Sequence, residues 1–258
     1  MKALQRILIT NDDGVYAPGI KVLQDIALQL CDDVWIVAPE VEQSGAGHSL
    51  TLRRPLRIRK ISEKRYGVDG TPTDCTMMGV QKVLKDMKPC LVLSGINYGA
   101  NLGEDVTYSG TVAAAMEATL LGIPSMALSL VTIPNQPVKW STPQQLAPDL
   151  IRRLIEKGWP SDVMININFP NAIVSSVKGV KVVKQGLRAS RDDLIEWHDP
   201  RGVPCYWIGG ADRLTKATEN HTDIEAVANG YIAITPLHLD LTHGATLKKL
   251  QHSFAESS

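Results

Sequence analysis

Short, uniformly apolar runs alternate with segments of helical periodicity along the first half of the chain. The apolar runs are typical of strands covered on both faces, and we expect them at 6–10, 34–38, 90–94 and 125–130. The segments between them place apolar residues three or four positions apart, which predicts helices at 18–30, 71–85 and 111–121. This alternation indicates parallel strands joined by right-handed crossovers.

The second half continues the pattern with more interruptions. After a proline-rich loop at 131–143, we expect a helix at 143–157, strands at 163–167 and 231–235, and an amphipathic helix at 245–254. Alternating residues predict a half-exposed antiparallel excursion at 50–61, and turn-rich runs predict hairpins within 178–210. The fold class is therefore α/β: a three-layer αβα arrangement with a Rossmann-like, mostly parallel sheet, some antiparallel strands and a C-terminal hairpin and helix extension.

Two helix ends carry local signals. Thr71 is a candidate N-cap, with Pro72 in the first turn and Asp74 three residues after the cap. Gly122 follows the helix expected at 111–121 and is a candidate for its C-terminal cap.

Composition limits the partners more than the fold. Acidic and basic residues balance at 27 each, so no overall field would attract nucleic acid or an anionic membrane. The four cysteines form no CxxC pair, and we expect free, mostly buried thiols of a reducing compartment. The sequence has no signal-peptide pattern and no apolar stretch long enough to cross a bilayer. We therefore expect a soluble cytoplasmic protein.

Polar residues gather in the loops that follow the predicted strands, where ligands bind in open α/β sheets. The first such loop contains Asn11, Asp12 and Asp13, the second contains Ser44, and the third runs through 94–101. Two carboxylates about 4 Å apart repel by roughly 4 kcal/mol at an effective dielectric near 20. Taken alone, the aspartate pair is more often a helix-capping turn. The neighbouring hydroxyl and amide oxygens favour a site for Mg²⁺ or Mn²⁺.

A second candidate site is the start of the helix at Ser109, Gly110 and Thr111. The free N–H groups of a helix N-terminus attract phosphate, although serine is also a common plain N-cap. Beside a divalent cation, these residues would complete a phosphate site.

Several familiar signatures are absent from the sequence. It contains no P-loop, no G-x-G-x-x-G in the first loop and no G-x-S-x-G elbow. Gly14 stands where a phosphatase with an Asp-x-Asp nucleophile would need its second carboxylate. Most of the histidines are expected at the surface or in structural hydrogen bonds. His48 is the exception to watch, because it shares the loop that contains Ser44.

Taken together, these motifs resemble the SurE family, the stationary-phase survival proteins, which are metal-dependent nucleoside monophosphate phosphatases. The matching stretches lie between residues 7 and 242, in the family's order, and read TNDDGVYAPG, VAPEVEQSGAGHSLTL, GTPTDC, SGINYGANLGEDVTYSGTVAAAMEA, NINFP and GYIAITPLHLDLT. One departure is Ala100, where many members have proline. The stretch 184–199 matches least clearly.

The resemblance implies 5′-nucleotidase activity, with some action on 3′-nucleotides or short polyphosphate. It implies one divalent cation per subunit, Mg²⁺ or Mn²⁺, held by Asp12, Asp13, Ser44 and Asn97. It also implies a homodimer or homotetramer with exchanged C-terminal segments. On this basis we expect a single domain over 1–258. Its sheet core covers about 1–130, 160–170 and 230–236, and its oligomerisation extension about 178–210 and 237–258.

We expect Asp12 and Asp13 to anchor the cation, which would polarise the phosphoryl group and activate an attacking water. Asn11 would position that water or orient a ligand. The phosphate oxygens would be bound by Gly45, Asn101, Ser109, Gly110 and Thr111.

Two alternative functions stay open at this point. One is a non-catalytic nucleotide-binding stress sensor with the same pocket. The other is mainly an exopolyphosphatase, for which the basic run Arg53 to Lys60 would be a candidate track. At zero net charge, that run is better explained as a solvated strand face. Whether an aspartate acts as base or nucleophile, and which base is preferred, cannot be read from the sequence.

Overall fold

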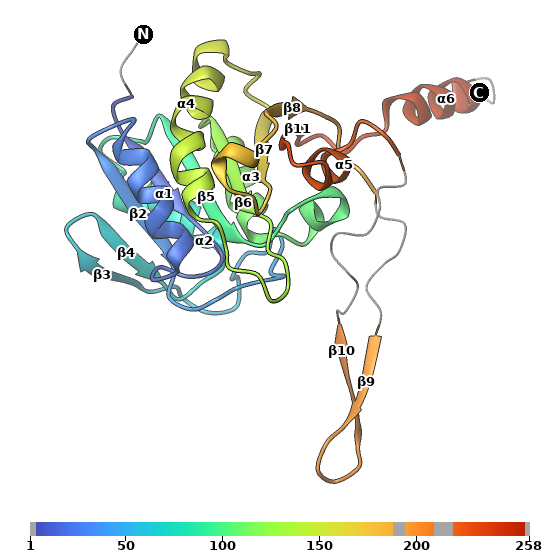
Figure 1. The fold of residues 1–258 in the computed structure, drawn as a ribbon, viewed down its shortest axis with the longest axis horizontal. Coiled ribbons are helices and arrows are strands. Elements are labelled where there is room, and N and C mark those ends of the chain that lie inside the picture. The colour runs from blue at the N-terminus through green and yellow to red at the C-terminus, as the bar shows by residue number, and fades with distance from the viewer. Residues whose placement is uncertain (1–3, 188–193, 209–218, 256–258) are drawn as a thin grey trace.

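The computed structural model describes residues 4–187, 194–208 and 219–255, and in this part of the chain a nine-stranded sheet forms the central layer (Figure 1). From one edge to the other, its strands are β3 (Ile58–Ser62), β4 (Arg65–Val68), β2 (Val34–Pro39), β1 (Ile7–Thr10), β5 (Leu91–Tyr98), β6 (Ser125–Leu130), β7 (Val163–Phe169), β11 (Ile232–His238) and β8 (Val180–Val182).

The middle of the sheet is parallel. Strand β1 pairs in parallel with β2 and β5, and the parallel arrangement continues through β6 to β7. Antiparallel pairs occur only toward the two edges of the described sheet, between β3 and β4 and between β7 and β11. The predicted class, a mostly parallel α/β sheet with antiparallel strands, is confirmed. As a consequence, β1, β2, β5 and β6 all end at the same edge of the sheet.

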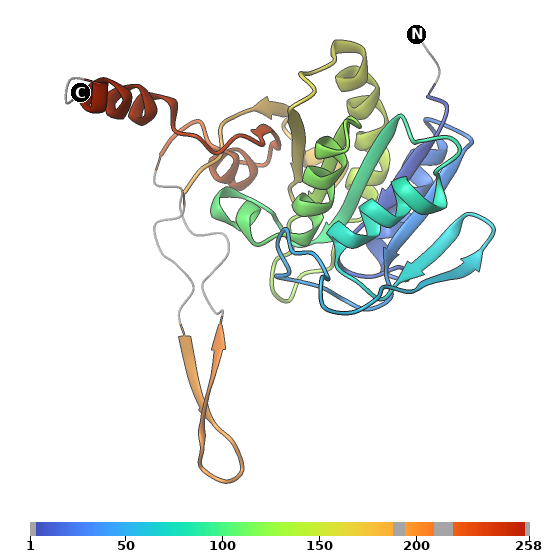
Figure 2. The same cartoon turned by 180° about the vertical axis from the view of Figure 1, so that it is seen from behind.

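Helices cover both faces of the sheet (Figures 1 and 2). Helices α1 (Pro18–Leu28) and α4 (Ser141–Lys157) pack on one face, where the apolar residues of α1 meet those of β1 and β5. Helices α2 (Pro72–Met78) and α3 (Gly110–Leu120) cover the other face. The remaining helical elements are η1 (Gly79–Val83), η2 (Gly103–Thr107), η3 (Val174–Ser176), α5 (Asp223–Ala228) and α6 (Gly244–Ala255).

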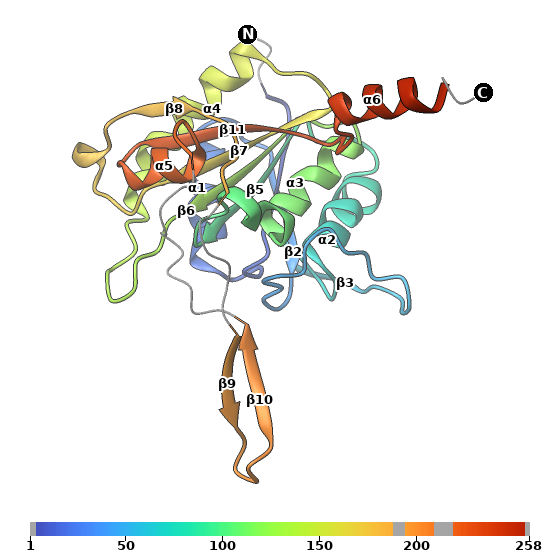
Figure 3. The same cartoon turned by 90° about the vertical axis from the view of Figure 1, so that its right-hand side faces the viewer.

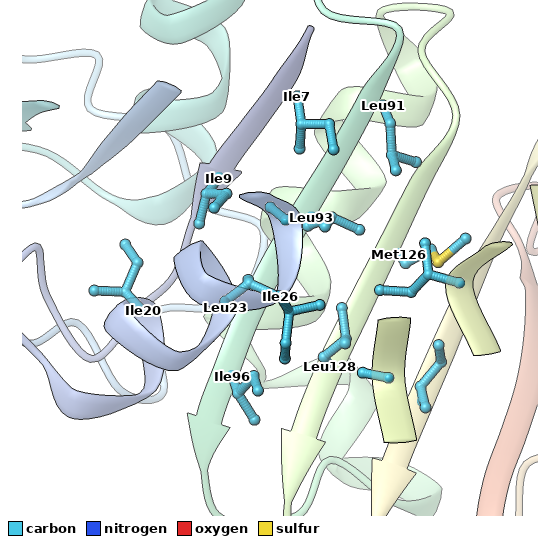
Figure 4. Close-up of a cluster of buried hydrophobic side chains, with 14 of the residues drawn as sticks. Ile7, Ile9, Ile20, Leu23, Ile26, Leu91, Leu93, Ile96, Met126 and Leu128 are labelled. Carbon is cyan, nitrogen blue, oxygen red and sulfur yellow. The ribbon is translucent and has the colours of Figure 1, made fainter. Parts of the chain in front are cut away.

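The core between the sheet and α1 holds the first strand and its loop in place (Figure 4). Ile7 and Ile9 of β1 are fully buried against Ile20, Leu23 and Ile26 of α1. Each such side chain contributes about 1.5–3 kcal/mol on burial. The polar loop at 11–17 therefore connects two elements whose positions are fixed by the core.

A two-stranded hairpin lies apart from the sheet. Strands β9 (Leu194–His198) and β10 (Pro204–Ile208) pair antiparallel, as predicted, and project away from the body of the molecule (Figures 1 and 3). The preceding short strand β8 does not belong to a hairpin, because it pairs in parallel with β11 at the sheet edge.

Three expectations need correction. The antiparallel excursion expected at 50–61 is confirmed only from residue 58, where β3 begins and pairs with β4, a strand that was not expected, whereas residues 50–57 have no regular structure. Helix α5 was not expected. The cysteines are free, as predicted, but Cys90 and Cys205 are exposed. No helix in the described ranges is long and apolar enough to cross a membrane.

The start of α2 fastens a distant loop as well as its own first turn. The predicted capping box is present: the Thr71 hydroxyl accepts from Asp74 N–H at 3.1 Å, and Asp74 Oδ2 accepts from Thr71 N–H at 2.9 Å. The buried Asp74 carboxylate also accepts from Thr51 N–H at 3.1 Å and from its hydroxyl at 2.6 Å. One carboxylate thus caps a helix and holds the chain that follows the Ser44 loop.

We expect Asp74→Ala to lower the free energy of unfolding by about 1–3 kcal/mol, because the donors of Thr71 and Thr51 lose a buried acceptor. Urea unfolding measures the change. Asp86→Ala, at an exposed position, is the control and should stay within about 0.5 kcal/mol of the parent. Equal stability of the two variants would contradict this role of Asp74.

Candidate active site

The aspartate pair lies where β1 ends, between the start of α3 and the end of β5. Asp12 is only 4% exposed, and its Oδ1 accepts a short hydrogen bond from the Thr111 hydroxyl. Burial raises the pKa of Asp12, and hydrogen bonds from the Thr111 side chain and from the N–H groups of Thr111 and Gly110 oppose that rise. The N-terminus of α3 therefore stabilises this carboxylate in its charged form.

Asp13 faces the other neighbour, β5. Its Oδ2 accepts from the backbone N–H of Tyr98 at 3.0 Å. Burial, followed by the negative charge of Asp12, raises the pKa of Asp13 to about 6, and the Tyr98 N–H acts in the opposite direction. Two adjacent carboxylates are thus held in a poorly solvated place, each fastened by a different element.

Gly110 lets α3 approach the pair closely. A Cβ at this position would lie 2.8 Å from Cβ of Asp12, 3.0 Å from its Oδ2 and 2.9 Å from Cγ of Pro72. The starts of α2 and α3 and the aspartate loop therefore meet at a point where there is no room for a methyl group.

The other two predicted phosphate-binding side chains near α3 are already engaged. The Ser109 hydroxyl caps the helix by accepting from Val112 N–H at 3.0 Å, which leaves its own proton available to a ligand. Asn101 is buried and donates from Nδ2 to Ser129 Oγ at 2.8 Å. Its position is fixed by the fold.

The Ser44 loop touches the site through its backbone. The N–H of Gln43 donates to the carbonyl oxygen of Asp12 at 2.8 Å. The exposed Ser44 hydroxyl instead donates to Glu42 Oε1 at 2.8 Å, and Gly45 is exposed in the same loop with φ of 76°. The backbone of this loop is therefore bonded to the aspartate loop, whereas Ser44 and Gly45 themselves are exposed to solvent.

His48, at the end of that loop, is held on α3. Its Nε2 lies 3.1 Å from Oε2 of the buried Glu117. This contact anchors the loop on the helix that also carries Thr111, so His48 has a structural partner.

Two asparagines border the aspartate pair. Asn97, near the end of β5, donates from Nδ2 to Gly99 O at 3.0 Å. This hydrogen bond does not use the amide oxygen Oδ1, which can still accept a hydrogen bond or bind a cation. Asn11 is fully buried and donates from Nδ2 to Gly14 O at 2.9 Å. Its Oδ1 has no hydrogen-bond partner among the described residues.

These groups fit a hard divalent cation. No Lys, Arg or His in the described ranges forms an ion pair with Asp12 or Asp13. The two carboxylates are therefore bound only by N–H and O–H donors, and no positive side chain balances their charge. The described residues also hold no cluster of three or more His, Cys, Asp or Glu side chains suited to a metal. A cation here would need amide and hydroxyl oxygens besides the two carboxylates, and such an all-oxygen set suits Mg²⁺ or Mn²⁺.

Sequence reasoning missed a group of buried asparagines beneath the site. Asn166 and Asn168 of β7 each donate to the carbonyl oxygen of Asn101, at 2.9 and 3.0 Å, and Asn168 Oδ1 accepts from Asn101 N–H. The signal was available: two asparagines two positions apart in an otherwise apolar run must share one buried face.

Asp223 was missed as well. This buried residue at the start of α5 accepts from Gly103 N–H at 2.9 Å and from Gly186 N–H at 2.8 Å. It ties the loop after Asn101 to the C-terminal part of the chain. The preceding Thr222, which caps α5, was the local signal.

The described part of the chain is an open, mostly parallel α/β sheet whose carboxyl edge, where ligands bind in such proteins, carries a carboxylate pair and a helix N-terminus. The family model of the survival protein SurE matches residues 7–192. The chain belongs to the SurE family.

Similar proteins cover almost the whole chain. A protein of Paramagnetospirillum magneticum, named 5′-nucleotidase SurE, is 60% identical over 96% of this chain and 95% of its own. Another with the same name, from Parvibaculum lavamentivorans, is 52% identical over 95% and 89%. The crystal structure of the SurE protein from Aquifex aeolicus superposes with a TM-score of 0.82 at 43% identity, covering 96% of this chain and 98% of that one.

We expect Gly110→Ala to lower the free energy of unfolding by about 1–3 kcal/mol, because the added methyl group overpacks the contact with Asp12 and Pro72. Urea unfolding of this variant is compared with Gly244→Ala, where a Cβ meets nothing within 4 Å. If both variants are as stable as the parent, the close approach described here is wrong.

Proposed function

We propose that this protein is a divalent-metal-dependent 5′-nucleotidase, which hydrolyses nucleoside 5′-monophosphates to nucleoside and phosphate. The observation that carries the proposal is the adjacent pair of buried Asp12, bonded to the N-terminus of α3, and half-buried Asp13, bonded to the end of β5, in a chain of the SurE family. The names of the similar proteins favour this activity over a nucleotide sensor or an exopolyphosphatase. A minor action on 3′-nucleotides or short polyphosphate is compatible with the same site.

In this proposal, Asp12 and Asp13 hold one Mg²⁺ or Mn²⁺ ion, and Asn97 and Ser44 complete the protein ligands. When bound, the cation would neutralise the charge of the phosphate and polarise its phosphorus–oxygen bonds. The Ser44 hydroxyl donates its proton to Glu42, and the lone pairs of its oxygen would remain for the cation. Asn11, whose buried Oδ1 has no partner among the described residues, would orient the attacking water or a ligand of the cation.

The phosphate would lie beside Asp12, at the start of α3. The N–H groups of Gly110 and Thr111, which donate to Asp12 in this structure, would be shared between Asp12 and the phosphate, and the capping Ser109 still has its hydroxyl proton to give. Asn101 and Gly45 would border the same space. Donors fixed by the helix stabilise charge that develops on the phosphate oxygens without having to reorganise.

A cytoplasmic location is part of the proposal. The four cysteines carry no disulfide, which is typical of a reducing compartment.

We expect Asp13→Asn to reduce phosphate release from adenosine 5′-monophosphate by about 100-fold or more, since one charge of the cation site is lost. The assay is run with Mn²⁺, with Mg²⁺ and with excess chelator, and the chelator should abolish the activity of the parent enzyme. Asp25→Asn, on α1 and away from the pair, is the control. Full activity of Asp13→Asn would refute the metal assignment.

We further propose that two or four copies of the chain assemble through the hairpin and α6, with exchanged C-terminal segments. A two-stranded hairpin alone is marginally stable in water. This one nevertheless exposes large apolar residues on both strands, with Trp197 64%, Trp207 69% and Ile208 82% exposed. Helix α6 exposes Leu247, Leu250 and Phe254 at helical spacing. Apolar groups of this size on separate projections are typical of surfaces that another subunit covers.

The double variant Trp207→Lys with Ile208→Lys is expected to shift the assembly toward monomer, because charged side chains would be buried at the contact. Sedimentation velocity gives the mass of the species in solution. Leu120→Lys, at an exposed leucine of α3, should leave the mass unchanged. A monomeric parent protein, or a double variant that assembles normally, would exclude this interface.

A further inference from the structure

An exposed aromatic ring stands next to the aspartate pair. Tyr98 is 59% exposed at the end of β5, while its backbone N–H is bound to Asp13 Oδ2 at 3.0 Å. Large apolar rings at the surface need a reason when they adjoin a buried polar site, because most of their area gains by leaving water.

The Tyr98 ring is held against a second aromatic residue. Its centroid lies 6.5 Å from that of Trp140, with the two planes at 41°. Trp140 is itself fixed: its ring lies against Gly19, where a Cβ would come 3.2 Å from Cη2, and the preceding Lys139 N–H donates to Asn171 Oδ1 at 2.9 Å. The two rings therefore form a preorganised platform, which lowers the entropy cost of binding a flat ligand.

The position of Tyr98 relative to the proposed phosphate site gives the direction of the substrate. Asp12 is bonded to the start of α3, where the phosphate would lie, whereas Asp13 is bonded to Tyr98 on the other side of the pair. The organic group of a phosphate ester must extend away from the helix N-terminus that holds the phosphate. The side of the pair away from α3 is the Asp13 side, so the organic group would extend toward Tyr98.

Two other exposed tyrosines adjoin the site but are placed differently. Tyr16 is hydrogen-bonded by the Arg59 side chain, which also pairs with Glu40, so it is drawn toward the β3 edge. Tyr108 precedes Ser109 on the phosphate side, and its carbonyl oxygen accepts from Gly47 N–H at 3.0 Å. Their contacts therefore lead to the β3 edge and to the Ser44 loop rather than to Asp13.

We propose that Tyr98, backed by Trp140, is the nucleobase subsite of this enzyme, where a purine ring stacks on the tyrosine. This proposal rests on the proposed nucleotidase function and adds to it the residue that binds the base. Stacking is tolerant of base identity, so the platform should bind adenine and guanine alike. It should favour both purines over the smaller pyrimidines, because a purine covers more of the tyrosine ring.

The test compares two substrates with the same phosphate ester, adenosine 5′-monophosphate and ribose 5-phosphate, which lacks the base. We expect Tyr98→Ala to lower the ratio of their kcat/KM values by about 5- to 10-fold, the lower part of the range for removing one base-stacking ring. Tyr98→Phe should preserve the ratio, because the ring and not the hydroxyl is required. Tyr108→Ala is the matched control at a neighbouring exposed tyrosine and should also preserve it.

A second measurement does not depend on turnover. Adenosine, which has the base but no phosphate, is titrated calorimetrically into parent, Tyr98→Ala and Tyr108→Ala protein, and we expect 5- to 10-fold weaker binding only in Tyr98→Ala. If the parent hydrolyses no nucleotide, the proposed function fails, and the adenosine titration still decides on the subsite. Equal losses for both substrates in Tyr98→Ala, or the same loss in Tyr108→Ala, would overturn the assignment.

Discussion

Two neighbouring carboxylates held out of water at the end of β1 set the conditions that the surrounding structure meets. Burial raises the pKa of both groups, and donors from α3 on one side and β5 on the other oppose the rise. Those donors are useful only if helix and strand approach the loop closely. Gly110 has no side chain where α3 meets Asp12, and Gly95 lets β5 bend where a Cβ would come 2.2 Å from Leu128 O. The two glycines therefore allow α3 and β5 to come close enough to donate hydrogen bonds to the two carboxylates.

The sequence was sufficient for the layered α/β fold because each buried strand is a continuous apolar run and each main helix has its own periodicity. The capping box of α2 was also predictable, since Thr71 and Asp74 are three residues apart. Residues 50–57 were mispredicted because alternation alone does not make a strand without a partner to pair with. Helix α5, with six residues, is too short for a periodic signal. The exposure of Cys90 depends on packing between distant segments, which local sequence does not record.

For the site, adjacency in sequence indicated Asp12 and Asp13, the anion affinity of a helix N-terminus indicated Thr111, and the family resemblance supplied Asn97. Side-chain directions were beyond this reasoning. Ser44 bonds to Glu42, and Asn101 is enclosed by asparagines of β7, because of contacts that only the folded chain creates. The pairing of Tyr98 with Trp140 joins the last residue of β5 to the residue before α4, so no local pattern could have indicated it.

The two hydrogen bonds that hold the aspartate pair also determine when the site exists. The bond between Asp12 and Thr111 closes a separation of 99 residues, and the bond between Asp13 and Tyr98 closes one of 85. Contacts this distant along the chain require the strands between them to be brought together, so the site exists only in the folded chain. An unfolded chain offers no such cluster of oxygens. Any ion or nucleotide that binds the cluster therefore stabilises the native state by mass action, and cellular supply of the ligand becomes part of the protein's resistance to unfolding.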